Sequence, residues 1–396
     1  MHDVIVIGAG PVGSRVAYKL ADAGYETLVI ERKESLDEPI CCTGIIGMEC
    51  VRRFEVDDSV IQRRFNSANV FSPSGNLVHL WREETQACVV DRSAFNVLFA
   101  NRARKKGAEY LLGNMVGKIR INEGGVNIDS TGTGSTVSYE ARAVVIASGF
   151  GDHLTQELGL GKISDFAGGA QAEVEADNLE ELEVYLGKQT APGFFAWLVP
   201  TAPGKALTGL MSRQTPGHYL EALLASLAEQ GKIKNPDVRI NSAGVSLGPL
   251  PKTYTDRVLV VGSAAGQVKP TTAGGIYYGL ICADIAAEKL RQGLENDKLT
   301  ATSLASYERE WKKTLAREIR ISHWGRKFFE LLSDKQIERI FSLVKSNGID
   351  KALSEADDLS FDWHGKALMR LITYRVLAGT ITGMRLPIPL IKSDRK

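Results

Sequence analysis

Apolar residues open this chain in a short unbroken run, residues 4–7, which is typical of a strand buried on both faces of a parallel sheet. The run passes into a glycine-rich turn, residues 8–13, and apolar residues at helical spacing continue over residues 14–23. A second apolar run covers residues 27–30. The pattern therefore predicts a strand, a helix and a second strand that form one parallel βαβ unit.

The turn has the spacing Gly-x-Gly-x-x-Gly, which lets backbone amides at the start of the helix approach a pyrophosphate. Glu31 ends the second apolar run, near the position at which a carboxylate binds the 2′-hydroxyl of an adenosine ribose. We therefore expect a dinucleotide, and its predicted contacts are Gly8, Gly10, Val12, Gly13, Glu31 and Arg32. A turn of an α/β protein that binds no ligand is the alternative.

Small residues and glycines recur over residues 39–47 and predict a loop that runs close to a bulky group such as a flavin ring. Cys42 in this loop either contacts that group or is an inert buried thiol. Alternating apolar and polar residues over 68–90 predict an antiparallel hairpin. Arg92 precedes a helix predicted over residues 93–106, where its guanidinium either binds a phosphate or ribityl group or is solvated.

The chain is then predicted to return to the parallel sheet. Strands predicted at residues 115–121 and 126–129 precede an apolar strand at 143–146, which ends in a turn containing Ser148 and Gly149. Small residues at the carboxyl end of such a strand are typical of a ligand site in an open α/β sheet.

A late strand and helix repeat this arrangement. The strand predicted at residues 256–261 runs into Gly262 and Ser263, and the paired glycines Gly274 and Gly275 begin a long helix. The positive end of that helix favours negative charge at the edge of a reduced flavin ring. An ordinary β-α corner is the alternative.

The region from residue 164 to 250 is mostly β, with strands predicted at 168–174, 194–200 and 206–211 and a helix at 218–230. Phe195, Trp197 and Val199 alternate onto one face of a strand. This aromatic stripe is either sandwich core or the wall of an apolar pocket.

The last part of the chain, residues 300–396, carries charged residues at helical spacing and is predicted to be a solvated helical cap. Its most apolar segment, residues 371–391, is interrupted by arginines and prolines, so we expect no membrane span but leave contact with a bilayer surface open. The first strand begins two residues after Met1, which leaves no room for a signal peptide. A cytoplasmic location is therefore expected.

Composition excludes further classes of protein. The 396 residues predict two or three sub-domains, and 48 Lys and Arg residues against 47 Asp and Glu give no basic excess that would indicate a nucleic-acid partner. Five cysteines without paired metal spacing predict reduced thiols and no metal site. The histidines form no ligand pair, and those expected at the surface are His153, His218, His323 and His364.

These motifs in this order resemble the FAD-dependent hydroxylase-like superfamily and, within it, the geranylgeranyl reductases. The resemblance covers about residues 1–300. Two features are specific to the reductases: Cys42 lies where they carry a cysteine beside the flavin, and Pro192-x-x-Phe195-x-Trp197-x-Val199-Pro200 is similar to their lipid-pocket motif Pro-x-x-Tyr-x-Trp-x-Phe-Pro. Ser263 departs from the family's usual Asp, which replaces a carboxylate contact to the ribityl chain by a weaker hydroxyl.

The resemblance implies an α/β fold with a Rossmann-like FAD-binding domain that is discontinuous in sequence. That domain is expected at residues 1–67, 88–160 and 251–298, an antiparallel β-sheet substrate domain at 68–87 and 161–250, and a helical C-terminal region at 299–396. The further cofactor contacts that it implies are Cys42, Thr43, Gly44, Ile45, Arg92, Val116, Ser148, Gly149, Gly262, Ser263, Gly274, Gly275 and Ile276. The implied substrate contacts are Gly193, Phe195, Trp197 and Val199.

The function that the resemblance implies is FAD-dependent saturation of C=C bonds in an isoprenoid, geranylgeranyl-type lipid chain, by hydride transfer from N5 of the reduced flavin. Cys42, or a water held near it or near Gly274, is the candidate proton source. The electron donor is left open between NAD(P)H and ferredoxin. The alternatives are an NAD(P)H-dependent flavin monooxygenase, a quinone-linked flavin dehydrogenase, and a flavin-binding or lipid-carrier protein without catalysis.

Overall fold

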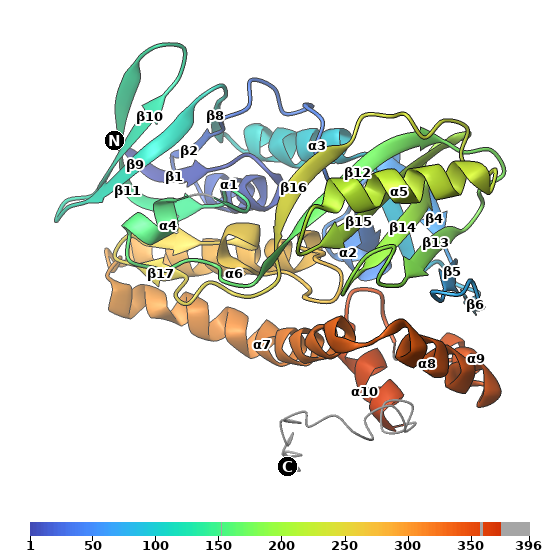
Figure 1. Cartoon of the computed structure of the whole chain (residues 1–396). Coiled ribbons are helices and arrows are strands. Elements are labelled where there is room, and N and C mark those ends of the chain that lie inside the picture. Colours follow the sequence, from blue (N-terminus) through green and yellow to red (C-terminus); the bar gives the residue numbers. More distant parts are fainter. Residues whose placement is uncertain (152, 357–358, 374–396) are drawn as a thin grey trace.

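Three β-sheets and a layer of C-terminal helices make up the protein (Figure 1). This computed structural model describes residues 1–373 except residues 152 and 357–358, and it gives no side-chain detail for residues 371–373. Of the apolar segment 371–391, residues 371–373 end α10, and residues 374–391 lie outside the described residues.

The first sheet has eight strands, six of which run in the order β17-β18-β11-β1-β2-β8, while β9 and β10 extend from β11. Its strands are β1 (His2–Ile7), β2 (Thr27–Ile30), β8 (Glu109–Leu111), β9 (Met115–Ile121), β10 (Val126–Thr131), β11 (Thr136–Ile146), β17 (Tyr254–Thr255) and β18 (Val258–Val260). β1 pairs in parallel with β2 and β11, and β11 pairs in parallel with β18. The predicted βαβ unit is therefore confirmed, with α1 (Pro11–Asp22) as its helix.

Both faces of this sheet are covered, which explains the unbroken apolar run at the start of the chain. Val4 and Val6 face a core shared with α1, α3 (Arg92–Lys105) and α6 (Ile276–Glu295), whereas Ile5 and Ile7 face a second core around Ile128. The short helix α4 (Leu154–Glu157) contributes Leu154 to that second core.

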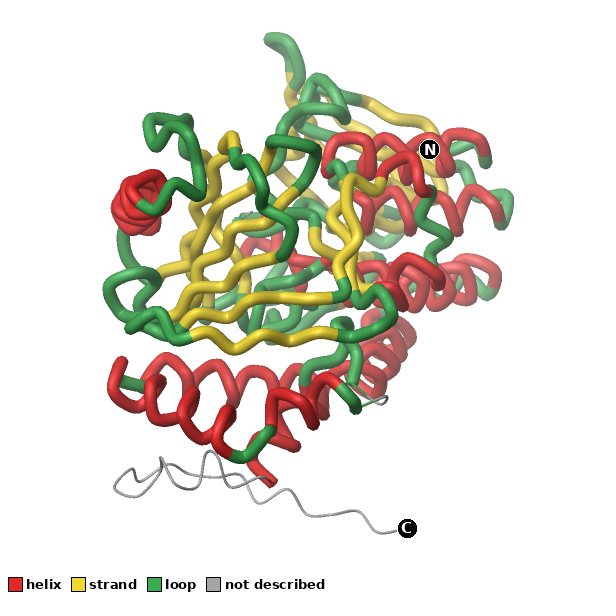
Figure 2. Tube along the Cα trace, turned by 90° about the vertical axis from the view of Figure 1, so that its right-hand side faces the viewer, coloured by secondary structure: helices red, strands yellow, loops and turns green. Residues whose placement is uncertain are grey.

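The second sheet has seven strands in the order β16-β12-β15-β14-β13-β5-β6. Figure 2 draws the strands in yellow, with the C-terminal helices in red below them. Its strands are β5 (Ser67–Phe71), β6 (Leu77–Trp81), β12 (Phe166–Glu175), β13 (Leu182–Leu186), β14 (Phe195–Pro200), β15 (Lys205–Ser212) and β16 (Asn241–Ser246). Helix α5 (Pro216–Glu229) covers the face that carries Ala196 and Leu198. Phe195, Trp197 and Val199 belong to other clusters, as their alternation predicts.

A small third sheet has the order β3-β7-β4. It packs against both large sheets, since Ile46 and Val90 belong to the core of the first sheet and Val89 packs with Val199 of the second. Its strands are β3 (Ile45–Gly47), β4 (Ile61–Phe65) and β7 (Ala87–Val90), and it is accompanied by α2 (Met48–Arg53) and the 3₁₀ turn η1 (Asp58–Val60). The expectation that residues 39–47 form only a loop is wrong for β3, and residues 87–90 do not belong to the hairpin sheet. Both differences arise because β3 pairs with β7, about forty residues away, so no local pattern marks the strand.

The C-terminal helices are α7 (Ala301–Leu331), α8 (Asp334–Ser346), α9 (Ile349–Ser354) and α10 (Gly365–Thr373). The prediction of a solvated cap is wrong for α7, because Leu304, Tyr307, Trp311 and Leu315 recur at helical spacing and are buried in the core of the first sheet. Helices α8 and α9 pack against β6 through an apolar cluster around Phe341.

None of the helices among the described residues is both long enough and apolar enough to span a membrane. The domain boundaries drawn from the sequence stay a prediction, although the strands other than β3, β4 and β7 divide between the two large sheets.

Candidate functional site

Parallel strands β2, β1, β11 and β18 end side by side at one edge of the first sheet. Three of the predicted contact segments follow these ends directly: the glycine turn after β1, Ser148 and Gly149 after β11, and Gly262 and Ser263 in the 3₁₀ turn η2 (Gly262–Ala265). The structure therefore brings these residues to the edge at which open α/β sheets bind ligands.

The glycine turn has no room for side chains at two of its positions. Gly8 has a φ of +105°, and a β-carbon there would lie 2.5 Å from the carbonyl oxygen of Ala147. A β-carbon at Gly13 would lie 2.0 Å from the carbonyl oxygen of Gly8. By contrast, nothing lies within 4 Å of the β-carbon position at Gly10, the N-cap of α1, so the backbone faces open space there. This open space is suited to a phosphate that approaches the amino end of α1.

Glu31 is held against the glycine turn. Its Oε2 accepts a hydrogen bond from the amide of Ala9 at 2.7 Å, and its Oε1 accepts one from the amide of Lys33 at 3.0 Å. Arg32 is exposed beside Glu31. The amide of Asn114 donates a hydrogen bond to the carbonyl oxygen of Glu31, and Val116, two residues further along the chain, is buried in β9. These predicted contacts thus share one corner of the site.

The turn after β18 packs against the glycine turn and against α6. Gly262 has a φ of +68°, and a β-carbon there would lie 3.1 Å from Cγ1 of Val12. A β-carbon at Gly275, the N-cap of α6, would lie 3.1 Å from Oγ of Ser263, and Ile276 follows as the first helical residue. Since both glycines sit against neighbours, a side chain at either would push these three segments apart.

Arg92 is the one predicted contact that carries a buried, unsatisfied cation. Its Nε and one terminal nitrogen are buried without a hydrogen-bond partner, and its guanidinium carbon lies 5.5 Å from the ring centre of Phe95. Gly44 lies against the same side chain, since a β-carbon there would be 3.0 Å from Cδ of Arg92. Buried guanidinium groups are normally paired, so this one is suited to an anionic ligand group.

The cysteine loop connects the first part of the chain with the second sheet. Oγ1 of Thr43 donates a hydrogen bond of 2.7 Å to the side-chain oxygen of Gln171 on β12, and Cys41 lies 3.4 Å from the carbonyl oxygen of Asn241 on β16. Burial raises the pKa of the Cys41 thiol to about 11, with a smaller contribution from Cys42. Cys42 is half-buried beside it, and Ile45 begins β3.

The aromatic stripe lies next to the loop that precedes α6. The rings of Phe195 and Trp197 are 5.8 Å apart, and both join an apolar cluster that also includes Ala273. Trp197 lies across Gly209 on β15, where a β-carbon would be 2.6 Å from its ring, and its indole nitrogen is buried without a partner. Ala273 lies directly before Gly274, so the structure places the predicted substrate wall beside the predicted flavin loop.

The other two predicted substrate residues, Val199 and Gly193, have different surroundings. Val199 is fully buried in a cluster with Phe65 and Val89, so it is core within the described residues. Gly193 has a φ of +79° and abuts α7, since a β-carbon there would lie 3.3 Å from Cγ of Glu330. Of the four predicted substrate residues, Phe195 and Trp197 are therefore the ones that the structure brings to the flavin loop.

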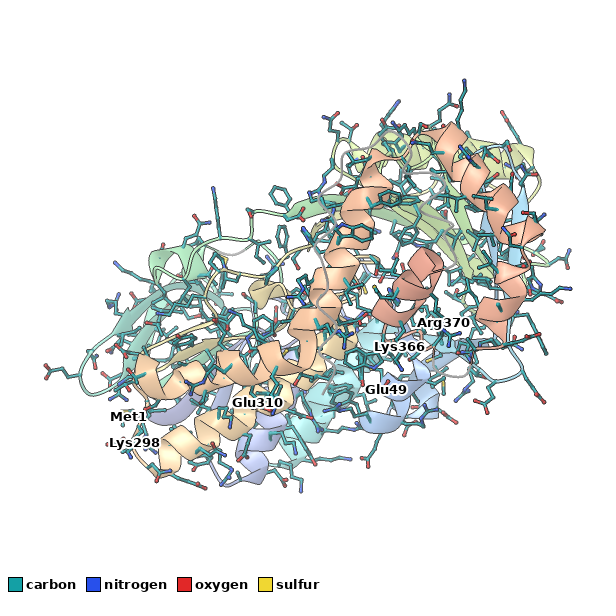
Figure 3. All side chains as sticks on the ribbon, turned by 90° about the horizontal axis from the view of Figure 1, so that it is seen from below. Met1, Glu49, Lys298, Glu310, Lys366 and Arg370 are labelled. Carbon is teal, nitrogen blue, oxygen red and sulfur yellow. The ribbon has the colours of Figure 1, made fainter. Side chains whose placement is uncertain are left out.

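Sequence reasoning missed the segment 360–364, which inserts beside the site from the C-terminal region. Asp362 is 1% exposed, and its carboxylate accepts hydrogen bonds from the amides of Gly47 and Cys50 at 3.2 and 3.3 Å. The indole nitrogen of Trp363 donates a hydrogen bond of 2.7 Å to Glu49, which is labelled in Figure 3. No local signal marks this contact, because its partners are more than 300 residues apart.

His364, which was expected at the surface, is half-buried, and both of its ring nitrogens form hydrogen bonds within the protein. Its Nε2 donates to the carbonyl oxygen of Phe361 at 2.9 Å, and since that proton defines the tautomer, its Nδ1 accepts from the hydroxyl of Thr271. Burial lowers the pKa of His364 to about 3, so the ring is neutral. His153 and His218 are exposed, and His323 is half-buried.

The residues present fit FAD. Arg92 offers a buried cation without a partner, the amino end of α1 faces open space at Gly10, and Glu31 lies where a ribose hydroxyl would bind. Within the described ranges, no group of three or more His, Cys, Asp or Glu side chains could hold a metal ion, and each of the five cysteines is a free thiol.

Comparisons with known proteins agree with this geometry. The family model described as lycopene cyclase protein matches residues 3–347. A digeranylgeranylglycerophospholipid reductase of Methanocaldococcus jannaschii is 31% identical to this chain over 365 residues, which cover 88% of this chain and 93% of the relative.

Solved structures resemble the fold as a whole. A geranylgeranyl bacteriochlorophyll reductase-like protein of Thermoplasma acidophilum superimposes with a TM-score of 0.85 at 22% identity, over 96% of this chain and 98% of that one. A probable FAD-dependent monooxygenase from Pseudomonas aeruginosa gives a TM-score of 0.67 at 16% identity, over 86% of this chain and 99% of that one.

Proposed function

This chain belongs to the lycopene cyclase protein family and, within it, to the geranylgeranyl reductases, and from this premise we propose that it is an FAD-dependent reductase of isoprenoid lipid chains. It saturates C=C bonds of a geranylgeranyl-type chain. The M. jannaschii relative's name makes a digeranylgeranyl glycerophospholipid the first substrate to test.

The observation that carries this proposal is the contact between the aromatic stripe and the loop before α6. Phe195, Trp197 and Ala273 share one apolar cluster, so a long hydrocarbon chain would lie against a wall that ends at the predicted flavin ring. Apolar side chains bind a prenyl chain by burial alone, because an isolated double bond offers no polar group to recognise.

When bound and reduced, FAD supplies a hydride from N5 to one carbon of the double bond. The chain's own residues bind and orient the two reactants. The Arg92 guanidinium neutralises an anionic part of the cofactor, and Glu31 binds the adenosine ribose. Phe195 and Trp197 hold the alkene and exclude water from it.

Proton delivery to the second carbon is assigned to the cysteine loop. The Cys42 thiol, or a water beside it, is the group that this loop offers, and the bond from Thr43 to Gln171 fixes the loop against the second sheet. Gln171 thus acts as a positioning residue for Cys42.

The partners that we propose are a prenyl lipid drawn from a membrane surface and an electron donor, either NAD(P)H or ferredoxin. A cytoplasmic protein with peripheral membrane contact fits both, since a lipid chain must leave a bilayer to enter the site. Nucleic acid has no part in this function.

An anaerobic experiment tests the proposal. The protein is reconstituted with FAD, reduced with dithionite and mixed with geranylgeranylated phospholipids, and the flavin absorbance is followed. We expect reoxidation by the unsaturated lipids and none by their fully saturated counterparts. Reoxidation only after oxygen is admitted, with a hydroxylated product, would instead support a monooxygenase.

A further inference from the structure

Lys269 is a buried lysine that the proposed function has not used. It lies in the loop before α6 and is only 4% exposed. Its Nζ donates a hydrogen bond of 3.0 Å to the carbonyl oxygen of Phe361 and lies 4.7 Å from the centre of the Phe361 ring. Lysine side chains are almost never fully buried unless they are paired, so a specific role is expected.

The ammonium group lies behind the paired glycines at the amino end of α6. The amide of Lys269 bonds to the carbonyl oxygen of Gly274 at 3.1 Å, which closes the loop. A β-carbon at Gly274 would lie 3.0 Å from Cε and 3.7 Å from Nζ of Lys269. Because Gly275 is the N-cap of α6, the charge of Lys269 adds to the positive end of this 20-residue helix.

The surrounding charges leave this cation only partly compensated. Among the described residues, no carboxylate oxygen lies within 4.0 Å of Nζ, although Asp362 and Glu318 are close enough to favour the charged lysine. Burial lowers the pKa of Lys269, and burial also raises the pKa of Asp362. The polar groups facing Lys269 therefore come from the 360–364 segment, α7 and Cys50 of α2, and the nearest of them is a neutral carbonyl.

We infer that Lys269 supplies a fixed positive charge behind the amino end of α6 that stabilises the reduced, negatively charged flavin and so raises its reduction potential. This inference rests on the proposed FAD site. A charge held at low dielectric acts over several ångströms, so Lys269 need not touch the ring. Asp362 and Glu318 oppose this effect, because their carboxylates carry charge of the other sign, and Asp362 interacts more strongly with Lys269 than Glu318 does.

The test measures the reduction potential of the FAD-loaded full-length protein by equilibration with a reference dye. K269M removes the charge at similar length, and K269R keeps it. D362N removes the opposing charge and should shift the potential in the other direction. K298M is the matched control, since Lys298 is exposed beyond the opposite end of α6 and is labelled in Figure 3.

We expect K269M to lower the ratio of reduced to oxidised flavin at a fixed potential about tenfold, which is ~30 mV for a two-electron couple. K269R should retain most of the wild-type ratio, D362N should raise the ratio, and K298M should leave it unchanged. A K269M potential equal to that of the wild type would overturn the inference, as would equal shifts in K269M and K269R.

Measurements of folding and of bound flavin distinguish the remaining outcomes of this experiment. If K269M does not fold, the D362N arm decides, and an unchanged D362N potential counts against the inference. A wild-type protein that takes up no FAD would overturn the proposed function and this inference together. A wild-type protein that binds FAD, with a K269M potential that does not move, overturns this inference alone.

Discussion

At the scale of single residues, Arg92 is the side chain whose surroundings most need a ligand. Two of its nitrogens are buried without partners, and Gly44 packs against its aliphatic stem. Leaving a charged group desolvated and unpaired costs free energy, which a bound anionic cofactor would recover. Hydrogen bonds between Arg92 and a bound cofactor would therefore stabilise the folded protein as well as hold the cofactor.

Replacing Arg92 should weaken FAD binding strongly. We expect R92M to raise the FAD dissociation constant about tenfold or more, because hydrogen bonds to charged groups contribute ~1.5–3 kcal/mol. Quenching of flavin fluorescence measures this constant. K105Q is the control, since Lys105 is exposed in the last turn of the same helix. Equal affinities for R92M and K105Q would contradict the assignment of Arg92 to the cofactor.

Sequence reasoning finds residues whose role is local and misses those whose role depends on distant partners. Gly8 and Gly13 were predictable, because the tight turn that needs them is encoded within a few residues. Gln171, Lys269 and Asp362 were not, since each acts through a partner from another part of the chain. For Asp362, the partner amides are those of Gly47 at the end of β3 and Cys50 in α2, and no spacing rule connects them with residue 362.

At the scale of elements, α7 is part of the core. Trp311 is 1% exposed, packs in the core of the first sheet, and donates a hydrogen bond of 3.0 Å from its indole nitrogen to Oγ1 of Thr253. The helical spacing of charged residues predicted the helix, but it did not show that the apolar residues between them are buried against the first sheet. β3 was missed for the related reason that a three-residue strand exists only through its pairing with β7.

Replacing Trp311 by alanine tests whether α7 is part of the core or a solvated cap. We expect W311A to lower the free energy of unfolding by about 3–5 kcal/mol, since it removes a large buried side chain together with its hydrogen bond to Thr253. K313A, at an exposed position on the same helix, should change it by less than about 0.5 kcal/mol. Urea unfolding followed by circular dichroism gives both values. If W311A lowered the free energy of unfolding as little as K313A does, α7 would be a solvated cap and not part of the core.

At the scale of the whole molecule, a charged cluster joins α7 to the second sheet. Asp165 precedes β12 and pairs with Arg326 of α7 and with Arg213, which follows β15. Arg213 also pairs with Glu330 of α7 at 2.8 Å. Burial alone would raise the pKa of Asp165, but the hydrogen bond from Arg213 and the charge of Arg326 outweigh it, so the pKa is lowered.

This cluster should make stability depend on pH. Because the pKa of Asp165 is lower in the folded protein than in the unfolded chain, its contribution is present above the unfolded pKa, about 3.9, and is lost as the pH falls through the folded value. We expect D165N to cost about 3 kcal/mol near neutral pH, and the gap to the wild type to narrow below about pH 4.

Unfolding by urea at neutral and at acidic pH measures that gap. E173Q is the control, since Glu173 forms an exposed pair with Lys205 and should contribute less than about 1 kcal/mol. A gap between D165N and the wild type that stays constant down to acidic pH would show that Asp165 does not act through its charge.

The central claim is that reducing equivalents held on a flavin pass to a prenyl double bond. Its most direct test is a single anaerobic turnover, in which FAD-loaded, fully reduced protein is mixed with excess digeranylgeranyl glycerophospholipid and the lipid is analysed by mass spectrometry. We predict that each flavin oxidised adds two hydrogens to one double bond and no oxygen. A flavin that stays reduced until oxygen is admitted, with lipid that gains oxygen or does not change, would contradict the claim.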